Sequence, residues 1–152
     1  MNRNTAPFAV EEANDSSGFL IWQVTMIWQR RIAAVLRPFE LTQVQFTLLA
    51  SLLWLSRRER PITQAMLARH AKLDMMMTSQ VLRALERHGL LERHPHPTDT
   101  RARALTLTRR GRALTRRAVP EVESADRSFF SALGRGLERF NDALIALIDT
   151  SA

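Results

Sequence analysis

The side chains best suited to binding a ligand in this sequence are arginines, and they are concentrated in one segment. Residues 83–117 contain ten arginines and three acidic residues, a net charge of +7 that equals the formal net charge of all 152 residues. The rest of the chain balances, with twelve basic and twelve acidic side chains. A neutral protein with one basic segment is typical of polyanion binding. Because the planar guanidinium group of arginine bonds bidentately to phosphate and to guanine, the sequence predicts nucleic acid as the partner.

A predicted helix that enters this segment presents methionine and polar side chains on one face. Asp74 can cap a helix over residues 75–88 whose inward face begins with Thr78. The outward face then carries Met75, Met76, Ser79, Gln80 and Arg83. Glutamine can pair with adenine, arginine with guanine or phosphate, and methionine can lie against thymine methyl groups. Alternatively, Met75 to Met77 only fill gaps at the helix start. Thr63 and Gln64 begin the preceding helix, whose N-terminal amides can meet a phosphate.

The elements that position these residues follow from the spacing of the apolar residues. Helices are expected over residues 18–36, 43–55, 64–71, 75–88, from 109 towards 130, and over 137–148. Two short strands, 91–94 and 103–107, flank a rigid and turn-rich segment, which predicts a β-hairpin. The third and fourth helices form a helix-turn-helix, and the hairpin after them is a wing. The expected fold is therefore mainly α with a small β-hairpin wing.

Several helix ends are marked by residues with specific capping chemistry. Thr42 and Gln45 have the spacing of a capping box. Gly89 stands where a left-handed cap at a helix C-terminus is expected. Pro120 lacks an amide hydrogen, so it is expected to kink or break the long helix that starts at residue 109.

Four stretches of the sequence resemble the winged helix-turn-helix of the MarR family, the multiple antibiotic resistance regulators. They are Thr63-Gln-Ala-Met-Leu-Ala, Gln80-Val-Leu-Arg-Ala-Leu-Glu-Arg-His-Gly-Leu-Leu-Glu-Arg93, Asp99-Thr-Arg101 and Leu105-Thr-Leu-Thr-Arg-Arg-Gly111. The form Leu-x-x-x-Gly-Leu-Leu-x-Arg is common to many winged helices, but its combination with the last two motifs at this distance is specific. Together the motifs cover roughly residues 61–112.

The resemblance implies a winged helix-turn-helix lobe flanked by long N- and C-terminal dimerisation helices. The expected division is a flexible lead-in over residues 1–17, a DNA-binding lobe over 41–112, and a dimerisation region made of 18–40 and 113–150. The resemblance also implies a homodimer that reads a pseudo-palindrome in double-stranded DNA and represses transcription until a small ligand binds. The residues themselves support a dimer, because both terminal helices are amphipathic with apolar faces too large for so small a domain to bury alone.

The resemblance further assigns roles within the wing. Arg101 matches an arginine that reaches the minor groove. Asp99 then either orients that arginine or holds the hairpin, since phosphate repels a carboxylate. His94, His96 and Arg103 are expected to lie near phosphates rather than to read bases.

An aromatic or lipophilic effector is implied between the dimer helices and the winged lobe. The candidate residues for its pocket are Trp22, Met26, Arg30 and Trp54. Tryptophan and methionine at helical spacing are also common in hydrophobic cores, so a core role is the alternative. The chain contains no cysteine, which excludes switching by thiol oxidation.

Enzymatic and metal-binding functions find little support. The sequence contains no Gly-x-Ser-x-Gly, no glycine-rich phosphate loop and no His-Glu-x-x-His, so neither an enzyme nor a cofactor is expected. His88, His94 and His96 could suggest metal sensing, but no carboxylate cluster accompanies them at ligand spacing, and no metal is expected.

No membrane partner is expected either, because no apolar run approaches the ~18 residues that span a bilayer. The N-terminus has no signal-peptide character, and we expect a cytoplasmic protein. The main alternative function is a basic winged-helix module that binds RNA or a protein partner without reading a DNA sequence.

Overall fold

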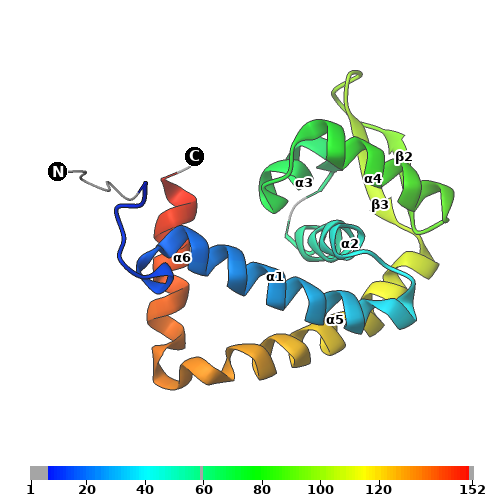
Figure 1. Ribbon diagram of the computed structural model, residues 1–152. Helices are drawn as coiled ribbons and strands as arrows, with labels where there is room; N and C mark the ends of the chain where they lie inside the picture. Colours follow the sequence, from blue (N-terminus) through cyan, green and yellow to red (C-terminus); the bar gives the residue numbers. More distant parts are fainter. Residues whose placement is uncertain (1–6, 59, 151–152) are drawn as a thin grey trace.

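The computed structural model describes residues 7–58 and 60–150 and has the expected mainly helical fold with a wing (Figure 1). The helices are α1 (Ser17–Leu36), α2 (Gln43–Leu55), α3 (Gln64–Ala71), α4 (Met75–Arg87), α5 (Arg109–Phe130) and α6 (Leu137–Asp149). The strands are β1 (Ile62–Thr63), β2 (Leu91–Pro95) and β3 (Arg103–Leu107). Short 3-10 helices lie at Ala13–Asp15, Arg37–Phe39 and Ser131–Gly136. Residues 1–6 of the expected lead-in lie outside the described residues.

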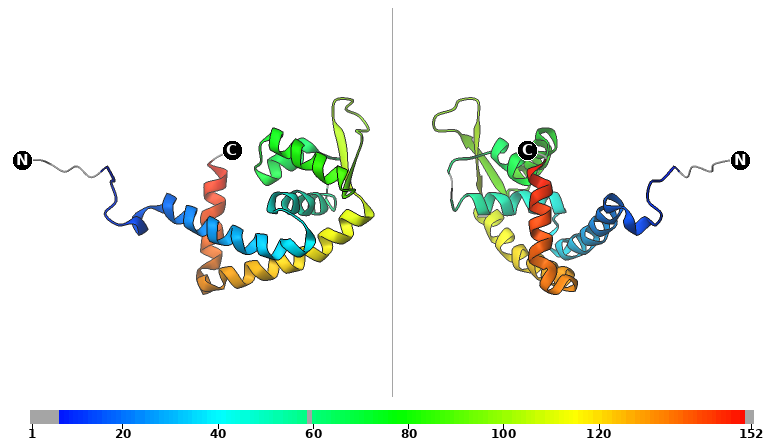
Figure 2. Two further views of the ribbon diagram at one scale, coloured as in Figure 1. Left: turned by 45° about the vertical axis from the view of Figure 1, so that its right-hand side comes forward. Right: turned by 90° about the vertical axis from the view of Figure 1, so that its left-hand side faces the viewer.

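The lobe formed by α2, α3, α4 and the sheet rests on two long helices. α1 and α5 run alongside each other beneath the lobe, and α2 packs against both of them (Figures 1 and 2). α6 turns away from the end of α5 and contributes no buried residue (Figure 1). The lobe and the long helices therefore share one body, whereas α6 projects from it.

Aliphatic residues form the core on which the lobe is built. Those from the lobe are Leu48, Leu49, Leu52, Ile62, Leu67, Leu82, Leu85, Leu91 and Leu105. The end of α1 and the first half of α5 join the same cluster through Ile32, Leu36, Ala118 and Val122. Because protein cores are close-packed and have low compressibility, this cluster fixes the positions of α4 and the wing relative to the long helices.

The predicted helix caps are confirmed. The Thr42 hydroxyl accepts the amide of Gln45 at 3.2 Å, and the Gln45 side chain accepts the amide of Thr42 at 2.9 Å, which completes the capping box. Gly89 has a φ of 67° and follows the end of α4, as expected for a left-handed cap. α4 ends at Arg87, one residue before the predicted end.

Pro120 does not break the long helix, so that part of the expectation is wrong. α5 continues from Arg109 to Phe130 with Pro120 inside it. The proline removes one backbone hydrogen bond, but Ala118 and Val122 on either side of it are buried in the core and hold both halves of the helix. Neither α5 nor any other helix within the described ranges is long and apolar enough to cross a membrane.

The wing is larger than the predicted hairpin because a third strand joins it. β1 pairs antiparallel with β3, with Ile62 opposite Leu105, and the strand order is β1-β3-β2. β2 and β3 pair from Leu91 opposite Leu107 to Pro95 opposite Arg103. A two-residue strand has no periodicity that a sequence could reveal, which is why β1 was not predicted.

Gly111 allows α5 to approach the turn after α4. Thr108 caps α5 by accepting the amide of Gly111 at 2.9 Å, and its hydroxyl donates to the carbonyl of Gly89 at 2.7 Å. The amide of Thr108 donates to the carbonyl of Leu90 at 3.2 Å. A Cβ atom on Gly111 would overlap the carbonyl oxygen of Leu90 and lie 2.7 Å from its carbonyl carbon. The Leu-Thr-Leu-Thr-x-x-Gly motif therefore packs the start of the long helix α5 against the winged lobe.

Candidate nucleic-acid interface

The outer face of α4 carries the residues predicted to read bases. Its inner face is anchored by Thr78, Leu82 and Leu85, all fully buried. Met75 and Met76 are 50% and 73% exposed. Gln80 and Arg83 are exposed, and Ser79 is half-buried. The structure therefore brings the five predicted residues to one surface, with Ser79 at its edge.

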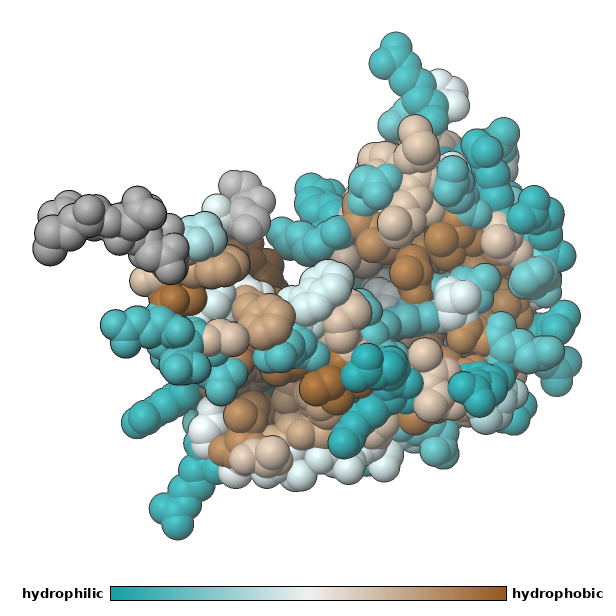
Figure 3. All heavy atoms as spheres, in the orientation of Figure 1, coloured by the Kyte–Doolittle hydropathy of each residue, from teal (hydrophilic) through white to brown (hydrophobic). Residues whose placement is uncertain are grey.

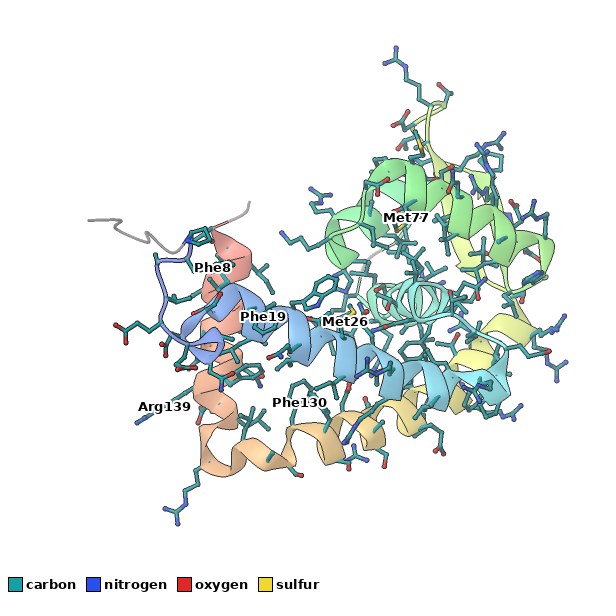
Figure 4. All side chains as sticks on the ribbon, in the orientation of Figure 1. Phe8, Phe19, Met26, Met77, Phe130 and Arg139 are labelled. Carbon is teal, nitrogen blue, oxygen red and sulfur yellow. The ribbon has the colours of Figure 1, made fainter. Side chains whose placement is uncertain are left out.

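Met77 was not among the predicted contacts, although it is 42% exposed at the same end of α4 (Figure 4). The helical periodicity places it next to the inward-facing Thr78, so the pattern gave it no outward position. The available signal was its place in a run of three methionines directly after the cap.

The side chains at the start of α3 hold the helix-turn-helix together. The Thr63 hydroxyl accepts the amide of Met66 at 3.3 Å and so caps α3. The Gln64 side chain donates to the carbonyl of Met75 at 3.4 Å, which links the first turn of α3 to that of α4. The sequence predicted the cap, but not the Gln64 bridge. The predicted phosphate contact of the α3 amides remains a prediction.

The tip of the wing is organised by Asp99 and His96. One Asp99 carboxylate oxygen accepts the amide of Arg101 at 2.9 Å, and the Asp99 carbonyl accepts the amide of Ala102 at 3.2 Å. The Nδ1 atom of His96 accepts the Asp99 amide at 3.0 Å. Asp99 thus holds the hairpin tip through the backbone of Arg101, and its role in orienting the Arg101 side chain stays a prediction.

His94 is engaged across the sheet. Its Nε2 atom lies 2.9 Å from the Thr106 hydroxyl on β3 and 3.4 Å from a carboxylate oxygen of Glu92. In the part of the chain that the structure describes, no group of three His, Asp or Glu side chains is placed to hold a metal ion. His94 and His96 thus have structural partners within the hairpin, and a phosphate contact by either one is a prediction that the structure leaves untested.

The structure divides the arginines of the basic segment into two groups. Arg93 contacts Glu86 at 3.2 Å and ties β2 to α4, and Arg110 donates to the carbonyl of His88 at 3.2 Å and ties α5 to the end of α4. The sequence did not predict either tie. No acid within the described ranges forms an ion pair with Arg83, Arg101 or Arg103. Among the described residues, the charges of Arg83, Arg101 and Arg103 therefore have no acidic partner.

The candidate effector residues lie in two separate hollows. Trp22, Met26 and Arg30 line a hollow of about 570 Å³ along α1. Trp54 lines another, of about 440 Å³, between α2 and α5. Arg58 covers the Trp54 ring, with its guanidinium carbon 4.7 Å from the ring centroid. The structure of the single chain thus brings three of the four residues together but not the fourth.

Comparisons with known proteins decide the family. A sequence model of the MarR family matches residues 41–102. The HTH-type transcriptional regulator YdcH of Bacillus subtilis is 42% identical over 119 residues, which cover 78% of this chain and 81% of YdcH. The chain belongs to the MarR family. The transcriptional repressor Rv2887 of Mycobacterium tuberculosis is 35% identical over 72% of this chain and 76% of that protein. The protein is thus a MarR-family transcriptional regulator, in a family of regulators rather than of enzymes.

A solved MarR-family neighbour contains DNA. The transcriptional repressor CouR of Rhodococcus jostii RHA1, bound to a 23-mer DNA duplex, is 25% identical and superposes with a TM-score of 0.75 over 95% of this chain and 98% of that one. The similarity therefore extends over the long helices as well as the lobe. The family match ends at residue 102, so it includes every candidate DNA-binding residue except Arg103.

Proposed function

We propose that this MarR-family regulator is a homodimer that binds a pseudo-palindromic operator and represses transcription. α4 enters the major groove and the wing reaches the adjacent minor groove. The observation that carries the proposal is the exposure of Gln80 and Arg83 on α4, and of Arg101 on the wing, on one lobe. The similarity to Rv2887, a protein named as a repressor, supports repression.

The dimer is supported by apolar surface on the long helices. Exposed residues of α1 include Phe19, Leu20, Ile21, Trp22, Val24 and Ile27, and those of α6 include Leu137, Leu144, Ile145 and Ile148. Figure 3 shows hydrophobic residues over the region of α1 and α6. Exposed apolar surface of this extent is typical of an interface. We therefore assign residues 18–40 and 113–150 to dimerisation, residues 41–112 to DNA binding, and residues 1–17 to the lead-in.

Binding selection on randomised duplex DNA at about 0.15 M salt tests the proposal. The expected result is a palindrome whose half-sites are about 10 base pairs apart. Because a dimer of this kind neutralises roughly six to ten phosphates, its affinity is expected to fall about 10³–10⁵-fold between about 50 and 200 mM salt. Binding without any consensus would instead favour the module that binds RNA or a protein partner.

The selected duplex then separates base reading from phosphate contact. Gln80→Ala is expected to weaken binding by about 1–3 kcal/mol and to relax the preference at one base pair of each half-site. Arg103→Ala is expected to weaken binding to all sequences alike and to lower the salt slope by about one per chain. Fluorescence anisotropy with the consensus and with single-base variants distinguishes the two patterns. If Gln80→Ala keeps the base preference, α4 does not read that base.

A small aromatic or lipophilic effector is proposed to act at the Trp54 hollow, because this hollow joins α2 of the lobe to α5. A phenolic acid such as salicylate is expected to release wild-type protein from its operator, and Trp54→Ala is expected to weaken that response about tenfold or more. Trp22→Ala is the comparison, since Trp22 lines the other hollow. The assignment fails if Trp54→Ala folds normally and responds like the wild type.

A further inference from the structure

A third hollow lies at the base of the wing, and no residue of α4 lines it. It has a volume of about 380 Å³, within the usual range for small-molecule sites. Its walls come from the end of α2, from β1, from β3 and from the first turn of α5. The chain that leaves α2 runs beside the wing strands here (right-hand view of Figure 2). The hollow shares no lining residue with the one at Trp54.

The floor of this wing-base hollow is apolar. Ile62, Leu105 and Leu107 line it and are only 2%, 2% and 9% exposed, so their side chains belong to the lobe core. Pro61 and Pro97 add ring surfaces from the loop after α2 and from the wing tip. A surface of this kind favours an apolar ligand body because burying it removes hydrocarbon from water.

The ionisable side chains that line the hollow are cationic. The Ser56 hydroxyl donates to the carbonyl of Leu53 at 2.9 Å, and the Thr106 hydroxyl pairs with His94 at 2.9 Å, so both are engaged. Arg60 and Arg112 also line the hollow, and none of the described acidic residues is in its lining. The Arg60 Nε atom donates to the carbonyl of Ser56 at 3.2 Å, so only the terminal nitrogens of its guanidinium group can serve a ligand. Within the described ranges neither arginine forms an ion pair with an acid.

We propose that the wing-base hollow binds a small amphipathic carboxylate. The hydrocarbon body packs on Ile62, Leu105 and Leu107, and the carboxylate pairs with the guanidinium group of Arg112, with Arg60 as a second donor. Guanidinium and carboxylate groups match in shape and form charge-assisted, bidentate hydrogen bonds. This site is additional to the proposed operator binding and to the effector hollow at Trp54, and it does not depend on either.

Methyl NMR of the full-length chain titrated with octanoate tests the site. The expected result is a saturable shift of the Ile62, Leu105 and Leu107 methyl signals at millimolar octanoate. Octan-1-ol, which has the same chain without the charge, is expected to bind at least about tenfold more weakly, because hydrogen bonds to charged groups are the stronger ones.

Two arginine variants test which guanidinium group pairs with the carboxylate of octanoate. Arg112→Gln is expected to weaken octanoate binding at least about tenfold. Arg116→Gln is the matched control: it removes the same charge one turn further along α5, at an exposed position that does not line the hollow. The proposal is overturned if octanoate shifts only signals around Trp54 or none at all, or if Arg112→Gln binds it as tightly as Arg116→Gln does.

Discussion

Replacing Gly111 with alanine is expected to destabilise the folded protein by about 3 kcal/mol or more, the upper end for overpacked sites. The added methyl group would overlap the carbonyl oxygen of Leu90, which is backbone and cannot swing away as a flexible side chain could. Relief requires α5 to move away from the turn at Gly89. That movement would pull Thr108 from its hydrogen bonds to Gly89 and Leu90 and separate the long helix from the lobe. Urea unfolding followed by circular dichroism measures the loss.

Gly18→Ala is the control for this experiment. No atom lies within 4 Å of the position where the new Cβ would stand, and Gly18 is in the first turn of α1. Alanine has the higher helix propensity, so this variant is expected to be as stable as the wild type or up to about 1 kcal/mol more stable. All samples need equal protein concentration, because the proposed dimerisation would make the apparent stability depend on concentration. Equal stability of Gly111→Ala and the wild type would mean that α5 does not pack against Leu90 as described.

Local chemistry explains why so much of the helical framework could be predicted. Thr42, Thr63, Asp74 and Thr108 each precede a helix and each accept a backbone amide from its first turn. This chemistry involves residues three apart in the chain, so a sequence displays it directly. The failures are non-local. β1 forms only because β3 lies beside it. α5 stays continuous at Pro120 because its neighbours pack in a core made by residues far away in the sequence.

The same difference between local and non-local contacts applies to the candidate binding residues. The outer face of α4 could be predicted because helical periodicity alone separates Gln80 and Arg83 from buried Leu82. The role of Asp99 could not be decided from the sequence, because it depends on which groups its carboxylate meets in the folded wing tip. For the effector residues, helical spacing relates Trp22 to Met26 but says nothing about the distance from α1 to Trp54 on another helix.

A double substitution on α6, Ile145→Glu with Ile148→Glu, is expected to convert the proposed dimer into a monomer and to weaken operator binding about 10³-fold or more. Both side chains are about half exposed in the single chain, at 55% and 48%, and they are three residues apart on one helical face. A dimer that buries this face would have to bury four unpaired carboxylates, two from each chain. A single lobe reads only one half-site, so its affinity is expected to approach the non-specific level.

Arg139→Glu provides a control with the same change in net charge, two units per chain. Arg139 is on α6 but points away from the rest of the molecule (Figure 4). Because α6 has no buried residue in the single chain, the double variant is expected to keep the fold, which circular dichroism verifies. Sedimentation velocity then reports the oligomeric state, and anisotropy reports operator affinity. If the double variant sediments as a dimer and binds the operator like Arg139→Glu, the chains associate through a surface other than α6, and the apolar face of that helix needs another partner.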